Sequence, residues 1–111
     1  QPDISVAGGF TECKKIAEMA NAWGVQCIPH VWGTQIGLAA ALQLIASLPD
    51  CPPSLNPIPP MLEFDMTPHP FRDRVVTEPI RQRGGFAETP RNPGLGIEIS
   101  KENILRKYLA H

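Results

Sequence analysis

One stretch of the sequence decides the fold: Cys27-Ile28-Pro29-His30-Val31-Trp32-Gly33. A short apolar run, residues 25–28, ends at a proline and a histidine, and a glycine-containing turn then leads into a segment rich in alanine and leucine. A histidine at the tip of a strand, facing the loop that opens the next helix, has the position of catalytic residues on parallel α/β scaffolds. The stretch therefore predicts an α/β fold with His30 as a candidate catalytic residue.

The segments on either side of this stretch have the apolar periodicity of helices. Apolar residues recur at helical spacing over residues 11–23, with Thr11 as the expected N-cap and Gly24 as the residue that ends the helix. Residues 34–48 are rich in alanine and leucine, and Thr34 is a second N-cap candidate. The sequence therefore predicts two helices, separated by the quoted stretch.

Short apolar runs alternate with these helices. Residues 25–29 and 61–64 are predicted to be buried strands of a parallel sheet. Between the second helix and the second run, the segment 51–60 contains several prolines, which exclude a regular helix or a central strand. This proline-rich segment is interpreted either as a rigid surface loop or as an ordered wall beside an active site.

The pattern changes after Phe71. Residues 74–77 and 85–88 are predicted to form short, partly exposed strands around a turn at residues 81–85. Ser100 is the expected N-cap of a final helix, which has an acidic residue early and basic residues late, as the helix dipole favours.

The composition is that of an ordinary globular protein. Of the 111 residues, 42% are hydrophobic and 19% are charged. The formal net charge of −1 gives no basic field that would attract nucleic acid or anionic lipid. The longest apolar run, residues 36–48, is too short and too polar to span a bilayer. We therefore expect no nucleic-acid partner and no membrane partner.

The cysteines and the first residues bear on cellular location. Cys13, Cys27 and Cys51 are odd in number and lack Cys-x-x-Cys spacing, which favours free thiols in a reducing compartment over disulfides or a zinc site. Residues 1–3 lack the basic start and the apolar segment of a signal peptide, and the missing initiator methionine indicates a cut within a longer chain. We therefore expect a cytoplasmic protein.

Acidic and imidazole side chains occur at regular spacing along the predicted strand tips. Asp3 lies at the end of the first predicted strand, His30 follows the second, and Glu63 lies near the end of the third. Each interval is about 30 residues, the length of one βα unit of a parallel sheet. In a barrel the tips of all parallel strands face the same end, so these side chains are expected to converge on one pocket.

An aspartate and a histidine on neighbouring strand tips can act as a proton-transfer dyad. The Asp3 carboxylate would accept a hydrogen bond from one imidazole nitrogen of His30 and stabilise the imidazolium, which leaves the other nitrogen to move a proton. Glu63 is interpreted either as a protonated donor to an anionic substrate or as a further acid or base. Trp32 lines the pocket or packs beneath a loop, and His69 is interpreted as a loop residue.

The sequence contains four distinctive motifs: Gln1-Pro2-Asp3, Ala7-Gly8-Gly9-Phe10-Thr11-Glu12, Pro29-His30-Val31-Trp32-Gly33 and Pro93-Gly94-Leu95-Gly96-Ile97-Glu98. Together they closely resemble the C-terminal part of the enolase superfamily, in the group of mandelate racemase and muconate lactonizing enzyme. Residues 56–65, with His69-Pro70 in place of Asn-Pro before Phe71-Arg72, look most like the branch of the D-galactarolactone cycloisomerases and sugar-acid dehydratases. The resemblance covers essentially the whole chain.

The resemblance implies a modified TIM barrel, (β/α)7β, with an N-terminal α+β capping domain. Residues 1–70 would be the last strands and helices of that barrel, starting at the tip of its sixth strand. Residues 71–111 would form a C-terminal tail that packs on the barrel and on the capping domain. The rest of the same polypeptide would then be the main partner of this chain, and the whole protein is expected to be a homo-oligomer.

The resemblance also implies a Mg2+-dependent enzyme that removes the proton α to the carboxylate of a sugar acid or sugar lactone, leading to cycloisomerisation or dehydration. Asp3 and His30 would be the dyad that acts as general base or acid, and Glu63 would hydrogen-bond the substrate carboxylate. Trp32 is the expected substrate-binding residue. The Mg2+ ligands would precede Gln1, so this chain is expected to supply no metal ligand and to be inactive alone.

Two alternatives to this enzyme remain open. A homologue that kept the scaffold and lost its activity would serve as a structural or sugar-acid-binding protein. A two-domain sugar-binding protein built on an open α/β sheet would place Asp3, His30 and Glu63 on different sides of the molecule.

Overall fold

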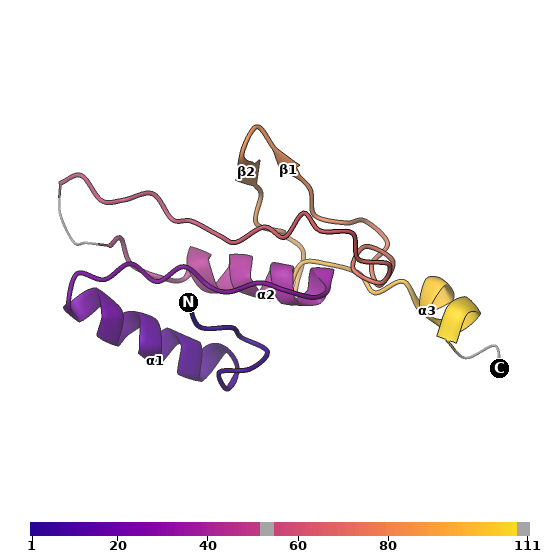
Figure 1. Ribbon diagram of the computed structural model, residues 1–111, viewed down its shortest axis with the longest axis horizontal. Helices are drawn as coiled ribbons and strands as arrows, with labels where there is room; N and C mark the ends of the chain where they lie inside the picture. Colours follow the sequence, from indigo (N-terminus) through magenta and orange to yellow (C-terminus); the bar gives the residue numbers. More distant parts are fainter. Residues whose placement is uncertain (52–54, 109–111) are drawn as a thin grey trace.

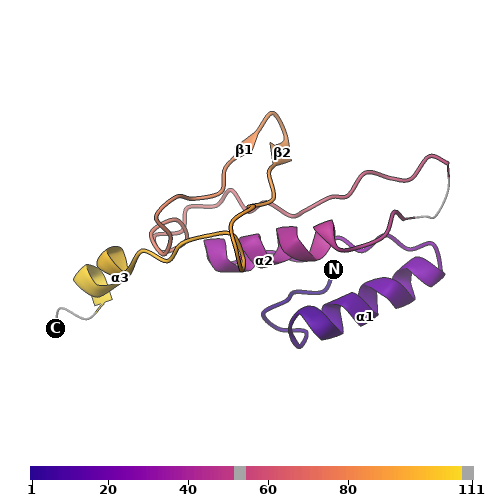
Figure 2. The same ribbon diagram turned by 180° about the vertical axis from the view of Figure 1, so that it is seen from behind.

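The computed structural model describes residues 1–51 and 55–108. Within these residues it contains helices and one small hairpin, in the order α1 (Gly9–Ala22), α2 (Gln35–Ala46), β1 (Gln82–Arg83), β2 (Phe86–Ala87) and α3 (Lys101–Tyr108). Helix α2 runs through the middle of the molecule, with α1 along one side of it and the chain that follows the proline-rich segment along the other (Figures 1 and 2). The hairpin and α3 project away from this body (Figure 1).

Helix α2 forms the core. Its leucines and its three consecutive alanines are buried, whereas α1 contributes Cys13 and Ala17. Alanine has the highest intrinsic helix propensity, and its small side chain lets neighbouring backbone approach closely. Each fully buried leucine stabilises the fold by about 2 kcal/mol. The run that the sequence predicted as a helix is therefore also the element around which the described chain packs.

The predicted helix ends are confirmed at three of four positions. The Thr34 hydroxyl accepts a hydrogen bond from the Ile36 backbone N–H at 3.3 Å, as an N-cap does. Helix α1 ends where expected, because the Gly24 N–H donates to a carbonyl in its last turn, and α2 ends before Pro49. The prediction for Thr11 is wrong, because backbone-bonded turns over residues 3–9 already start α1 at Gly9.

The two predicted strands run as elongated segments but form no ladder among the residues that the structure describes (Figure 1). Directly after residues 25–29, the His30 N–H donates a hydrogen bond to the Pro2 carbonyl at 3.2 Å. This bond connects the run to the first residues of the chain. The Gln26 side-chain amide donates to the Pro59 carbonyl at 3.0 Å, which ties residues 25–29 to the segment that leads into residues 61–64. A strand of a parallel sheet needs a continuous series of backbone hydrogen bonds to its neighbours. These segments have only isolated hydrogen bonds, so the described residues do not form the predicted parallel sheet.

The first part of the tail differs from the expectation of partly exposed strands. Val75 and Val76 are 1% and 2% exposed, so they belong to the core. The Thr77 N–H donates to the Glu98 carbonyl at 3.0 Å and the Ser100 N–H donates to the Val75 carbonyl at 2.8 Å, so this segment pairs with residues 98–100 and not with the hairpin. Successive side chains of an extended segment point to opposite faces, and β-branched valines pack well there, so both valines can be buried.

The hairpin turn and the last helix agree with the predictions made from the sequence. Strands β1 and β2 are antiparallel and are joined by a turn of two glycines, within the predicted turn region. Helix α3 begins after Ser100, whose hydroxyl accepts from the Asn103 N–H at 3.4 Å, so the predicted N-cap is confirmed. Glu102 and Arg106, which lie one turn apart on α3, form an ion pair on the exposed surface of this helix.

The proline-rich segment is irregular in its described part. Cys51 and Ile58 form an isolated antiparallel bridge, while residues 52–54 and the prolines at 52 and 53 lie outside the described residues. The three cysteines are free thiols, with Cys13 buried. In the two described ranges, we find no helix with the length and the apolar character that crossing a bilayer demands.

Gly96 is a position where an added methyl group is expected to destabilise the protein strongly. Its φ is +78°, and a Cβ would lie 2.5 Å from the Pro90 Cβ and 2.8 Å from the Pro90 carbonyl carbon. We expect Gly96→Ala to lower the free energy of unfolding by about 2–3 kcal/mol, from left-handed strain and overpacking together. Gly84→Ala is the control, because its φ is +57° with nothing near the added Cβ. Equal losses in urea unfolding of the two variants would contradict the predicted clash.

Candidate active site

Three segments that are far apart in the sequence meet at one site. The bond from the His30 N–H to the Pro2 carbonyl, 3.2 Å long, sets the first segment beside the strand-like run. The Glu63 carboxylate reaches across from the third segment and accepts the Val31 N–H at 3.1 Å. Asp3, His30 and Glu63 therefore converge, as their spacing predicted. This convergence is what the open-sheet alternative does not allow.

Asp3 and His30 form a hydrogen-bonded pair. The Asp3 Oδ2 lies 3.0 Å from the His30 Nδ1, and the Ser5 N–H donates to the other oxygen of the same carboxylate at 2.7 Å. Because the carboxylate is the acceptor, Nδ1 carries the proton, and in the neutral ring Nε2 has the free lone pair. The pair is set at the surface of the chain, where the His30 side chain is 46% exposed and that of Asp3 18%.

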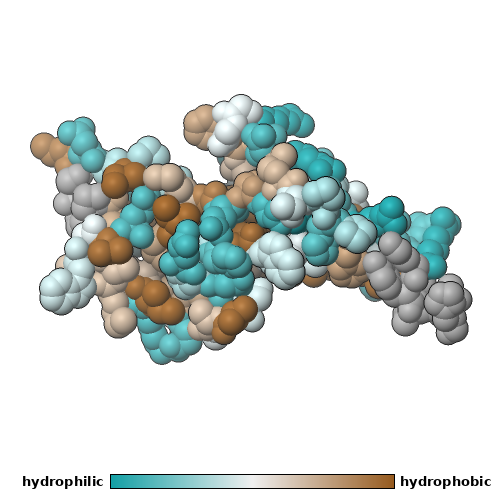
Figure 3. Space-filling view, viewed as in Figure 1, coloured by the Kyte–Doolittle hydropathy of each residue, from teal (hydrophilic) through white to brown (hydrophobic). Residues whose placement is uncertain are grey.

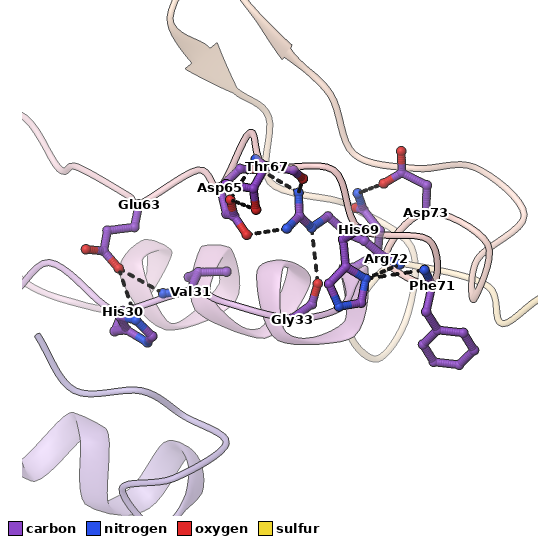
Figure 4. A network of polar contacts seen from close by, with 11 residues as sticks. His30, Val31, Gly33, Glu63, Asp65, Thr67, His69, Phe71, Arg72 and Asp73 are labelled. Carbon is purple, nitrogen blue, oxygen red and sulfur yellow. Dashed lines mark hydrogen bonds and ion pairs between the residues drawn. The ribbon is translucent and has the colours of Figure 1, made fainter.

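Glu63 lies on the opposite side of the imidazole ring. Its Oε2 accepts the Val31 N–H and lies 3.9 Å from the His30 Nε2, as Figure 4 shows. Its Oε1 accepts from the side-chain amide of Gln1 at 3.2 Å. The imidazole is therefore held between two carboxylates, with Nε2 on the side of Glu63.

The electrostatics of the pair follow from these contacts. The hydrogen bond that His30 donates to Asp3 raises the pKa of His30 above its ordinary value. Desolvation opposes this rise, and the charges of Glu63 and Asp3 add to it. Burial acts to raise the pKa of Asp3, but the hydrogen bonds from His30 and Ser5 outweigh it, and the net pKa is lowered. A carboxylate that stays ionised beside a more basic imidazole is the arrangement that a proton-transfer dyad requires.

Trp32 occupies the loop directly after His30. Its side chain is 69% exposed, and its ring lies edge-on to the ring of His69, with centroids 6.3 Å apart and planes at 87°. His69 is a loop residue, as predicted, and its Nδ1 accepts the backbone N–H groups of Phe71 and Arg72 at 3.3 and 2.9 Å (Figure 4). The exposed position leaves Trp32 available to line a pocket.

Sequence reasoning gave no role to Arg72, which holds the two loops of the site together. Its guanidinium donates to the carbonyls of Gly33, Asp65 and Thr67 and pairs with the Asp65 carboxylate (Figure 4). The side chains of this ion pair are 14% and 15% exposed, so it is largely shielded from water. Hydrogen bonds from Thr67, together with Arg72, lower the pKa of Asp65. The sequence signal was present only as the motif Phe71-Arg72.

The residues present here do not fit a magnesium site. Both oxygens of Asp3 and both oxygens of Glu63 face hydrogen-bond donors of the protein, whereas Mg2+ needs oxygen ligands arranged around one centre. Within residues 1–51 and 55–108, no group of three or more histidine, cysteine or acidic side chains is arranged to hold a metal ion. A metal-dependent step would have to use residues beyond those described.

The chain is similar to known proteins over most of its length. A family model for the enolase C-terminal domain-like fold matches residues 1–103. The chain is 48% identical over 104 residues to D-galactarolactone cycloisomerase of Agrobacterium fabrum, covering 94% of this chain and 28% of that protein. It is 34% identical over 113 residues to D-galactonate dehydratase of Ralstonia pickettii, covering 96% of this chain and 28% of that protein.

The chain is also similar to a solved structure of a related enzyme. The crystal structure of 3,6-anhydro-D-galactonate cycloisomerase from Zobellia galactanivorans superposes with a TM-score of 0.78 and 40% identity, over 96% of this chain and 28% of that one. The chain thus spans a little over a quarter of the length of the curated relatives it matches. It belongs to the enolase C-terminal domain-like family, in the group of mandelate racemase and muconate lactonizing enzyme.

Proposed function

We propose that this chain is the C-terminal part of an enzyme that removes the proton α to the carboxylate of a sugar acid or sugar lactone, in a cycloisomerisation or a dehydration. The observation that carries the proposal is the Asp3–His30 pair at 3.0 Å, with the His30 Nε2 left to face a substrate. The relatives named above include a sugar-lactone cycloisomerase and a sugar-acid dehydratase. Both reactions can begin by loss of such a proton.

In this proposal each residue of the cluster has a separate task. His30 takes or returns a proton at Nε2, and Asp3 keeps Nδ1 protonated and stabilises the imidazolium that forms. Glu63, whose Oε2 lies 3.9 Å from Nε2, hydrogen-bonds the substrate beside the carbon that reacts. Trp32 covers the bound sugar from the loop after His30. Rings with an apolar face and a polar edge are well suited to this position.

We assign the metal and the rest of the barrel to other parts of the polypeptide. Mg2+ would supply electrostatic stabilisation of the negative charge that develops when the α-proton leaves. Residues 1–70 would close a (β/α)7β barrel with earlier strands, and residues 71–111 would return toward a capping domain. Exposed apolar side chains on α1 and directly after it, among them Met19 at 66% and Trp23 at 87%, support this, because neighbouring elements would cover them. Figure 3 shows hydrophobic surface on the side of the molecule where α1 lies.

Homo-oligomers and a cytoplasmic location belong to the same proposal. An inactive homologue would have the same scaffold and a similar cluster, so only activity separates it from the enzyme. The test is to incubate the complete protein and Mg2+ with a panel of aldaric acids, aldonic acids and their lactones, and to follow product formation by NMR. Turnover of at least one compound is expected, whereas binding without turnover across the panel would favour the inactive homologue.

A further inference from the structure

We propose that Gln1 is a positioning residue of this site, which holds the Glu63 carboxylate beside the reactive nitrogen of His30. The inference rests on the proposed function for its effect on turnover, but its structural content does not. The Gln1 amide donates to the Glu63 Oε1 at 3.2 Å, while the Val31 N–H donates to Oε2 at 3.1 Å. Each oxygen of the carboxylate thus has its own donor, from a different segment of the chain.

The contact is part of a regular arrangement over the first three residues. Asp3 accepts from the His30 ring, the Pro2 carbonyl accepts from the His30 backbone, and the Gln1 side chain reaches over to Glu63. Side chains alternate along an extended segment, so Gln1 and Asp3 point to the same face with Pro2 between them. The proline restricts the preceding residue to extended backbone, which favours that direction. One short segment therefore orients both groups that flank His30.

The Glu63 carboxylate needs a second donor to be fixed in orientation. Its side chain is 36% exposed, and the terminal torsion of a glutamate is broad, so a single backbone donor leaves one oxygen free to turn. The second donor from Gln1 fixes the plane of the carboxylate and keeps Oε2 3.9 Å from the His30 Nε2. A glutamine amide can supply this donor at any pH, because it does not titrate.

The consequence can be measured at His30. The charged side chains that face its ring are those of Asp3 and Glu63. If Gln1 holds Glu63 in place, then removing the amide weakens the contribution of Glu63 to the field at Nε2. We therefore expect Gln1→Met, which keeps the side-chain length and removes the donor, to lower the pKa of His30.

The test is an NMR titration of the His30 ring in the complete protein, for Gln1→Met, Glu63→Gln and the double variant. The pKa is expected to fall in each single variant, and the double variant should match Glu63→Gln. An unchanged pKa in Gln1→Met, or a further equal fall in the double variant, would overturn the inference. Gln26→Met is the matched control, because Gln26 donates to the Pro59 backbone and should leave the pKa unchanged.

Kinetics provide a second, separate readout. With a substrate that the wild-type protein turns over, we expect Gln1→Met to lower kcat/KM about tenfold, at the weak end of the range for a hydrogen bond to a charged group. The same substitution should have no further effect when Glu63 is already glutamine. If the wild-type protein turns over no sugar acid or lactone, the proposed function fails, and the titration still decides the role of Gln1.

Discussion

The His30→Asn variant is expected to lose turnover by about 10²–10⁴-fold, the usual contribution of a positioned general acid or base. Asparagine keeps a hydrogen-bond donor for Asp3 but cannot accept a proton from carbon at neutral pH. We expect the loss to appear in kcat, because the proton is transferred in the chemical step. The measurement is steady-state kinetics of the complete protein on a substrate that the panel identifies.

Stability provides the control for this variant. The His30 side chain is 46% exposed, so the substitution removes little packing. At a pH above the folded pKa of His30, where the charged pair no longer adds stability, the unfolding midpoint should be close to that of the wild type. Loss of turnover in a protein that still folds would assign the effect to chemistry. Unchanged turnover would remove His30 from the mechanism.

The Asp3→Asn variant is expected to have a loss of similar size, up to about 10⁴-fold by analogy with other carboxylates that orient a catalytic histidine. The amide no longer stabilises the imidazolium, and it can favour the wrong tautomer of the ring. Because the Asp3 hydrogen bond raises the pKa of His30, that pKa should fall in the variant. If unprotonated His30 is the base, the acid limb of the kcat/KM profile moves to lower pH.

The Asp3–His30 pair makes a contribution to stability that depends on pH. The lowered pKa of Asp3 stabilises the folded state at pH values above the ordinary aspartate pKa, and this is lost as pH falls through the folded pKa. The raised pKa of His30 stabilises it below the ordinary histidine pKa, and this is lost as pH rises through the folded pKa. Asp3→Asn should therefore be less stable than the wild type above the ordinary aspartate pKa, with the largest loss between the two limits, and should approach the wild type below the folded pKa of Asp3. An equal loss at every pH would contradict the pairing.

The sequence predicted those parts of the fold that depend on local physics. Helix α2 could be recognised because its alanines and leucines and the Thr34 cap all favour the same element. The convergence of Asp3, His30 and Glu63 could be predicted because βα units repeat at nearly constant length. In these places, short-range signals and the overall topology agree.

Other parts depend on contacts that leave no local pattern. Burial of Val75 and Val76 follows from pairing with residues 98–100, more than twenty positions away, and a short valine-containing run does not specify its partner. Thr11 has the chemistry of an N-cap, but the turns that follow Asp3 start the helix earlier. The contacts of Gln1 and Arg72 are side-chain bonds across distant segments, which no spacing rule contains.

The most direct test of the central claim follows the α-proton itself. The complete wild-type protein and its His30→Asn variant are incubated with a sugar acid or lactone substrate in deuterated water, and the α-position is followed by NMR. If His30 exchanges the proton it removes with solvent, the wild type incorporates deuterium at that carbon, and the variant does so at least a hundredfold more slowly, at the lower end of the range for general acid–base catalysis. Equal incorporation by both proteins would contradict the account.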